Sequence, residues 1–234
     1  MTETEWLACT DPEWMPDFLK GRASGRKLRL FACACLRRMV HLGWPDAEPS
    51  KALEVSEAFA DGRAGAGQLA EVRSNLWAMG GISPKWAVNC AGHAVLDDDA
   101  HEAATGAVHM GRQFYYLRAA ARRKGRNWFV YDVNPETPEG IAAREVGSKE
   151  QAEILRDVTG NPFRPVTLDP PWLTPAVVSL ARTIYDERAF GRVPELANAL
   201  VKAGCTNRDI LEHCRSGGPH VRGCWVVDLI LGKS

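Results

Sequence analysis

The sequence of 234 residues contains no apolar run long enough to cross a membrane. Its longest apolar runs, Phe31–Leu36 and Trp225–Val227, are far shorter than the ~20 residues that a membrane-spanning helix needs. The first residues are acidic and lack the basic and apolar regions of a secretory signal. We therefore expect a cytoplasmic protein that has no membrane partner.

A net charge is also missing, because Lys and Arg together number 29 and Asp and Glu together number 29. A balanced charge gives no overall attraction to nucleic acid or to anionic lipid, although it does not exclude local basic patches. Hydrophobic residues make up 45% of the chain, which is ordinary for a protein that folds around a core. The composition therefore indicates a globular protein of one large domain or two small ones.

Signatures of the common enzyme classes are absent as well. The chain contains no Gly-x-Ser-x-Gly elbow, Walker loop, Gly-x-Gly-x-x-Gly fingerprint, His-Glu-x-x-His motif or protein-kinase set. A Cys–His nucleophile made by Cys214 or Cys224 with His220 is conceivable, but it needs a third residue that orients the histidine. No such residue can be named, so the sequence favours a non-enzymatic function without deciding the question.

What the chain does have is a helical pattern along almost its whole length. The clearest helix begins at Ser24, where Leu28, Phe31 and Cys35 follow the spacing of one buried helix face. Five prolines fall within residues 160–175, and such a run cannot be helical. We therefore predict a mainly α fold, an irregular multi-helix bundle with two helical halves and a Pro-rich strap at 160–175.

The predicted boundary between the halves lies at residues 125–138, where the helical pattern stops. The best strand-like run, Trp128–Val133, is bounded closely by Asn134-Pro135 and Thr137-Pro138, which are turn signals. We predict an N-terminal helical half at 1–124, a linker or small hairpin arm at 125–138 and a C-terminal helical half at 139–234.

The last thirty residues concentrate the chemistry. Three of the seven cysteines and two of the six histidines lie there. Zinc prefers four Cys, His or carboxylate ligands in a tetrahedron, so this segment could hold an ion. Against this, the segment has no Cys-x2-Cys pair, and the alternative is that the cysteines are core residues and the histidines bond to backbone carbonyls. The candidate metal ligands are Cys205, His213, Cys214, His220 and Cys224.

Two basic clusters suggest a second kind of site. Residues 20–38 and 118–126 are rich in Lys and Arg, which can contact phosphates. Residues 196–215 also have the rhythm of a helix-turn-helix with Gly204 in the turn, but Asp209 and Glu212 make the second helix poorly suited to a groove. A solvated basic helix face is the alternative. The candidate nucleic-acid-binding residues are Arg26, Lys27, Arg29, Arg37, Arg38, Arg122 and Arg123.

Long distinctive strings occur near both ends of the chain. The first half opens with EWLACTDPEWMPDFL and RKLRLFACACLRR, and the second contains ILRDVTGNPFRPVTLDPPWLT, IYDERAF, LANALVKAGC and DILEHCRSGGPHVRGCWVVDLILGK. These strings resemble an uncharacterised planctomycete (bacterial) protein family over residues 1–61 and 150–233. The resemblance implies no activity, cofactor or site residue.

The hypotheses on function are therefore three. A helical chain rich in Trp, Arg and Pro, residues suited to packed contact surfaces, is first expected to be a non-enzymatic interaction or adaptor protein whose partner is another protein. The second hypothesis is nucleic-acid binding through basic helix faces. The third is a zinc-stabilised domain built on the C-terminal Cys/His cluster.

Overall fold

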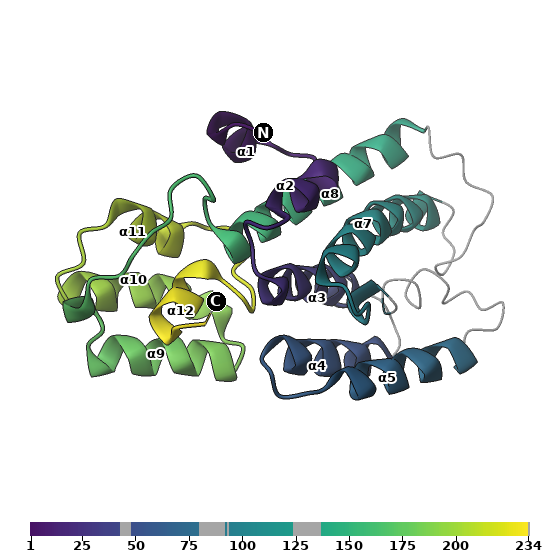
Figure 1. The fold of residues 1–234 in the computed structure, drawn as a ribbon. Coiled ribbons are helices and arrows are strands. Elements are labelled where there is room, and N and C mark those ends of the chain that lie inside the picture. The colour runs from purple at the N-terminus through teal and green to yellow at the C-terminus, as the bar shows by residue number, and fades with distance from the viewer. Residues whose placement is uncertain (43–47, 80–91, 93, 124–136, 234) are drawn as a thin grey trace. The chain divides into compact units, whose positions relative to one another are not determined.

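The computed structural model describes residues 1–42, 48–79, 92, 94–123 and 137–233. Within these ranges the side chains of residues 48–50, 77–79, 117 and 120–123 are not described. The described part of the chain contains eleven α-helices and no strand, so the predicted mainly α fold is confirmed (Figure 1). No helix among the described residues combines the length and the apolar character that a membrane crossing requires.

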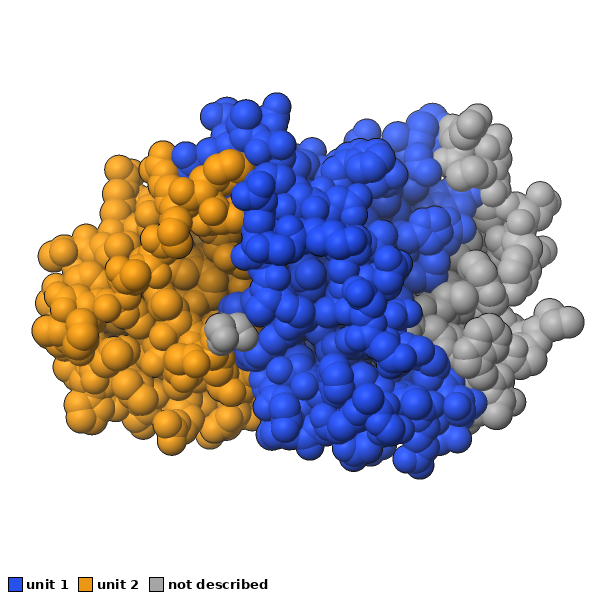
Figure 2. Space-filling view, viewed as in Figure 1, with its two compact units in different colours: residues 1–152 blue, residues 153–234 orange. Residues whose placement is uncertain are grey.

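The chain divides into two compact units, residues 1–152 and residues 153–234 (Figure 2). The division falls inside helix α8 (Pro138–Thr159), whose last turns belong to the second unit. Residues 125–136 of the predicted arm, and with them the strand-like run Trp128–Val133, lie outside the described residues.

The helices of the first unit are α1 (Glu3–Ala8), α2 (Met15–Leu19), α3 (Gly25–His41), α4 (Glu48–Ala60), α5 (Ala66–Met79), α7 (Ala100–Arg123) and most of α8, with a 3-10 turn η1 (Pro12–Trp14). Helix α3 lies at the centre and packs against α4 and α7. The Ser24 side chain caps its first turn by accepting a hydrogen bond from the Lys27 N–H. Leu28, Phe31 and Cys35 are buried, as their spacing predicts.

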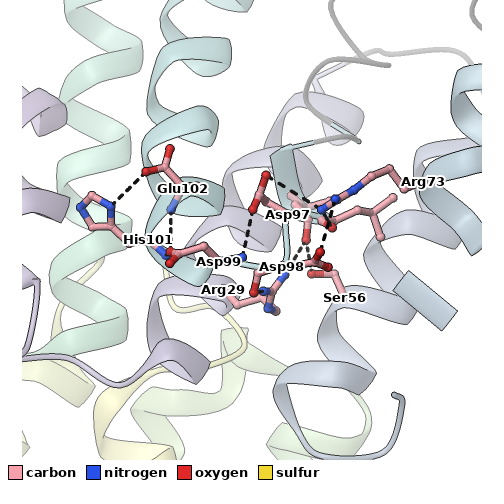
Figure 3. A network of polar contacts seen from close by, with 10 residues as sticks. Arg29, Ser56, Arg73, Asp97, Asp98, Asp99, His101 and Glu102 are labelled. Atoms are coloured by element: carbon pink, nitrogen blue, oxygen red, sulfur yellow. Dashed lines mark hydrogen bonds and ion pairs between the residues drawn. The ribbon is translucent and has the colours of Figure 1, made fainter. Parts of the chain in front are cut away.

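A network of polar contacts fixes the turn that precedes α7 (Figure 3). The guanidinium of Arg29, on α3, donates to the Val95 carbonyl at 3.0 Å and to the Asp98 carbonyl at 3.1 Å. The Ser56 hydroxyl, on α4, donates to the same Val95 carbonyl at 2.6 Å. Because buried carbonyls need donors, these contacts hold the turn against α3 and α4.

The second unit contains the end of α8 followed by α9 (Pro175–Asp186), α10 (Val193–Lys202), α11 (Arg208–Arg215) and α12 (Trp225–Leu231), with 3-10 turns η2 (Pro170–Trp172) and η3 (Phe190–Arg192). Helix α9 packs against α10 and α12, and α10 packs against α11. Thr174 caps α9 and Pro175 occupies its first turn, the arrangement that the Thr-Pro pair predicts. The core includes Val177, Ile184, Leu200, Ile210 and Val226.

The Pro-rich segment 160–175 packs onto this core as the sequence predicts. It is not α-helical, and its apolar residues Val166, Leu168 and Trp172 are partly buried against the core of the second unit. Phe163, which lies in the same segment, is exposed instead. The segment therefore covers the helices of its own unit and leads the chain from α8 into α9.

Candidate metal centre

Three separate segments of the second unit meet around one carboxylate. Asp157 lies in the last turn of α8, between the buried residues Leu155 and Val158. His213 lies in the last turn of α11, His220 lies in the loop that follows, and Cys224 is the N-cap residue of α12. One ligand atom from each of these four residues lies within 4.8 Å of the other three.

The chain enters and leaves this cluster through tightly defined turns. Gly160, with φ +70°, ends α8, and a Cβ atom placed on it would lie 3.2 Å from Cγ of Trp225. The Trp225 ring in turn packs against the His213 ring, with a centroid separation of 5.0 Å. The Ser216 hydroxyl donates to the His213 carbonyl at 2.8 Å and so stops α11. These contacts position the end of α8 and the histidine of α11 together.

The distances within the cluster are short. His213 Nε2 lies 3.2 Å from Asp157 Oδ1 and 3.2 Å from Cys224 Sγ. His220 Nδ1 lies 2.8 Å from Asp157 Oδ1, and the Val221 N–H donates to Asp157 Oδ2 at 2.9 Å. The Asp157 and His220 side chains are only 5% and 6% exposed, and Cys224 is fully buried. The His213 side chain is 16% exposed, so the cluster is mostly but not fully shielded from bulk water.

Burial and neighbouring charges set the ionisation of the cluster. Burial acts to raise the pKa of Asp157, but hydrogen bonds from His213 and His220 outweigh it and hold that pKa below its ordinary value. Burial, together with the negative charge of Asp157, raises the pKa of the Cys224 thiol well above its ordinary value. Without a cation, the cluster consequently holds a carboxylate beside a protonated thiol.

This arrangement leaves a conflict at His213 Nε2, because one nitrogen faces two groups with opposite needs. If Nε2 carries the proton, it donates to Asp157, and the Cys224 S–H finds no acceptor there. If Nε2 is bare, it accepts from Cys224, and its lone pair then faces the Asp157 carboxylate. A cation removes the conflict, since nitrogen, oxygen and thiolate sulfur would all direct lone pairs at it.

The donor set and its spacing fit a zinc ion. Zn–N and Zn–O bonds of about 2.0–2.1 Å and a Zn–S bond of about 2.3 Å in a tetrahedron imply ligand separations of roughly 3.3–3.6 Å. The observed separations at His213, both 3.2 Å, are close to these values. His220 offers either ring nitrogen, because Nδ1 faces Asp157 and the buried Nε2 has no hydrogen-bond partner among the residues that the structure describes.

The sequence-predicted ligands divide into two groups. His213, His220 and Cys224 lie in the cluster. Cys205 and Cys214 are buried in the apolar core of the unit, and neither belongs to the cluster of donor atoms. Cys214 follows the buried Ile210 by four residues on α11, and this spacing directs both side chains to the same, core-facing side of the helix.

Asp157 is the functional residue that sequence reasoning missed. It lies 63 residues before His220, so no local spacing connects it to the C-terminal cluster. The signal that was available is its position in α8. Asp157 lies between the buried residues Leu155 and Val158, so it is a carboxylate in a buried stretch of the helix.

The cysteine does not have the geometry of a catalytic nucleophile. The residue that contacts Cys224 is His213 rather than His220, and Cys224 is fully buried, so substrate cannot reach its sulfur. In a nucleophile–base–orienting set, the orienting carboxylate bonds to the second nitrogen of the histidine. Here Asp157 and Cys224 contact the same nitrogen, and the described cluster contains no relay.

Four of the seven basic residues singled out for nucleic acid make hydrogen bonds or ion pairs within the first unit. Arg29 is buried in the network of Figure 3. Arg26 pairs with Asp61 at 3.1 Å, Arg37 with Glu57 at 2.9 Å, and Arg38 with Glu150. Lys27 is partly buried on α3. The side chains of Arg122 and Arg123 lie outside the described residues.

A cavity of about 300 Å³ adjoins the cluster. Asp157, His213 and His220 line it, whereas Cys224 does not. Glu153 and Arg156, which precede Asp157 on α8, also line the cavity. Three of the four candidate ligand residues therefore face a hollow on the second unit.

Comparison of the chain with protein-family models, with curated proteins and with solved structures finds no match. The resemblance to a planctomycete family remains a prediction from the sequence strings. The geometry of the cluster is therefore the main structural indication of function.

Proposed function

We propose that the second unit is a zinc-binding domain in which Asp157, His213, His220 and Cys224 hold one ion. The observation that carries the proposal is the convergence of four donor atoms from three segments within 4.8 Å of one another, two of them on buried and two on partly buried residues. Groups that are far apart in the sequence rarely share such a volume without a common partner, because burying a carboxylate and two imidazoles is unfavourable unless they are paired.

The donor types favour zinc over other common cations. Magnesium and calcium prefer sets made only of oxygen atoms. One thiolate and two imidazoles with a single carboxylate suit zinc, and a complete set of four protein ligands is typical of structural zinc sites.

The proposed role of the ion is to tie the end of α8 to α11 and to the start of α12. The loop 217–223 that carries His220 contains three glycines. A flexible loop has a high conformational entropy when free. Binding of zinc to His220 within the loop and to Cys224 directly after it would offset this entropy and fix the loop against α8.

Elemental analysis tests the proposal. Protein purified without added chelator is expected to carry one zinc per chain, and the Cys224→Ala variant is expected to carry much less. A zinc content well below one per chain in wild-type protein reconstituted under reducing conditions overturns the proposal. Equal zinc in the variant does so as well. Asp169→Asn, an exposed acid of the same unit, is the matched control and is expected to retain the zinc.

We further propose that the protein acts by contacting another protein and does so in the cytoplasm, where a thiolate ligand stays reduced. Support for a contact surface comes from the first unit, where Trp14 is 68% exposed and Leu7 is 55% exposed. Exposed large apolar side chains are enriched where partners bind. Arg26, Arg37 and Arg38 already pair with acids of the unit, and Arg29 donates to backbone carbonyls. Nucleic-acid binding through these four residues therefore has less support.

Site-specific cross-linking in cells tests the contact surface. A photoreactive amino acid in place of Trp14 is expected to give a discrete conjugate of higher mass. The same amino acid in place of Lys202, an exposed residue of the second unit, is expected to give none. Absence of a conjugate at position 14, or the same conjugates at both positions, contradicts the assignment.

A further inference from the structure

The cavity of about 300 Å³ lies on one side of the metal-binding cluster. Asp157, His213 and His220 line it, but Cys224 does not, so the thiolate lies at the closed end of the site. An ion held by these four residues would therefore face the cavity between the carboxylate and the two imidazoles. Zinc accepts a fifth ligand, and the direction left for it is the cavity.

The Asp157 carboxylate has one partner that does not depend on the ion. Its Oδ2 accepts from the Val221 N–H at 2.9 Å. Asp157 can consequently keep its position in the fold when another anion enters the cavity. That anion then either binds the ion beside Asp157 or replaces Asp157 as a ligand. Loss of Asp157 from the ion would leave two histidines and one cysteine, and three protein ligands with one exchangeable position are typical of zinc sites that bind small molecules.

The remaining charges of the cavity indicate the kind of ligand. A zinc ion together with one thiolate and one carboxylate ligand has no net charge. The positive charge that favours an incoming anion is therefore that of the Arg156 guanidinium. Glu153 lines the same cavity one turn before Asp157, and its negative charge disfavours a ligand that carries two negative charges. The volume is at the lower limit of small-molecule sites. The ligand should therefore be small and singly charged.

Building on the proposed zinc site, we propose that this cavity binds a small monocarboxylate, with its carboxylate between the ion and Arg156. Glu153 would accept a hydrogen bond from a donor group elsewhere on the same ligand. Arginine binds planar carboxylates through two parallel N–H donors. The same donors also attract phosphate dianions, but here the negative charge of Glu153 repels a dianion.

Cobalt-substituted full-length protein tests this inference, because a thiolate-bound Co²⁺ reports its coordination in the visible spectrum. Acetate is the probe, acetamide is the neutral control of the same shape, and inorganic phosphate is the competing anion. We expect acetate to shift the spectrum saturably, acetamide to leave it unchanged, and phosphate to bind more weakly than acetate.

Two variants sharpen the assignment. Arg156→Gln is expected to weaken acetate roughly tenfold, the effect of losing one charge-assisted contact, with the cobalt content unchanged. Glu153→Gln is expected to strengthen phosphate relative to acetate. Arg182→Gln, an exposed arginine of α9, is the matched control and should change neither.

The outcomes separate the two proposals. One cobalt per chain with no response to acetate overturns the ligand site and leaves the zinc proposal standing. Tighter binding of phosphate than of acetate in the wild-type protein overturns the assignment of a monocarboxylate. Failure to bind cobalt or zinc overturns the metal site, and the ligand site with it.

Discussion

The Nε2 atom of His213 lies 3.2 Å from the Sγ atom of Cys224 across eleven residues that include a glycine-rich turn. The same nitrogen lies 3.2 Å from Asp157. This one atom therefore links α11, α12 and α8. Substitutions can test whether these contacts bind a metal ion and whether the packing around them stabilises the fold.

Cys224→Ala and Cys214→Ala should have opposite consequences for metal binding. Both cysteines are fully buried in the second unit, but only Cys224 belongs to the cluster. We expect Cys224→Ala to lower zinc affinity by more than about 100-fold. This loss exceeds the one that is typical when the mutated residue only hydrogen-bonds to a metal ligand. We expect Cys214→Ala to keep one zinc per chain and to lower the free energy of unfolding by about 1 kcal/mol through the cavity it leaves. Competition titration with a chromophoric chelator measures the affinities, and equal affinities of the two variants would contradict the assignment.

Asp157→Asn should weaken both the metal site and the metal-free fold. The substitution removes a negative charge and replaces one acceptor oxygen with a donor, which then opposes either His220 or the Val221 N–H. We expect the zinc affinity to fall at least about tenfold. The metal-free unfolding free energy should fall by about 2 kcal/mol, because a buried donor loses its acceptor. Urea denaturation in the presence of chelator isolates the second effect, and no change there would show that these hydrogen bonds do not stabilise the fold.

Arg29→Met should destabilise the first unit. The Arg29 side chain stacks over Phe59 and donates to the Val95 and Asp98 carbonyls. Its loss removes both hydrogen bonds and the stacking contact, and the Val95 carbonyl keeps the hydrogen bond from Ser56. We expect the unfolding free energy to fall by about 3 kcal/mol. Arg63→Met, an exposed arginine beside Asp61, should change it by less than about 0.5 kcal/mol.

A nucleic-acid-binding assay distinguishes a structural role of Arg29 from a role in binding phosphate. Fluorescence anisotropy with DNA and RNA at low salt is expected to show the same response for wild type and both arginine variants. A stable Arg29→Met protein that has lost binding measured in wild type would instead assign Arg29 to a phosphate contact.

Comparison of Gly160→Ala with an alanine at Gly204 should separate the cost of backbone strain from the cost of a side-chain clash beside the metal site. Gly160 has φ +70° and a potential Cβ contact with Trp225 at 3.2 Å, whereas Gly204 has φ +85° and open space around it. An alanine at Gly204 is expected to cost about 1 kcal/mol through its left-handed conformation alone. Gly160→Ala is expected to cost more, roughly 2 kcal/mol, because Trp225 must also move. Gly217→Ala, which meets neither constraint, is the control, and thermal denaturation compares the three variants.

Much of the helical architecture can be predicted from local signals in the sequence. Ser24 and Thr174 accept hydrogen bonds at the start of α3 and α9, as polar residues before apolar periodic segments should. The five prolines of segment 160–175 exclude helix there. These signals act over a few residues, so they can be read without knowledge of the rest of the fold.

The candidate site could be predicted only in part because its completion is non-local. His213, His220 and Cys224 lie within one short segment, whose density of donors indicates metal chemistry. Spacing alone does not show that Cys214 faces Ile210 and the core, because His213 and Cys214 are neighbours and either could face inward. Asp157 arrives from a helix 63 residues earlier than His220, and only the packing of α8 reveals it.

X-ray absorption at the zinc edge of the reconstituted protein tests the central claim most directly, because it counts sulfur and nitrogen or oxygen neighbours of the ion. The account predicts one sulfur at about 2.3 Å and three nitrogen or oxygen atoms at about 2.0–2.1 Å in the absence of added anions. Two or more sulfur neighbours would place Cys214 or Cys205 on the ion, and a shell with no sulfur would exclude Cys224. Either result contradicts a site made by Asp157, His213, His220 and Cys224.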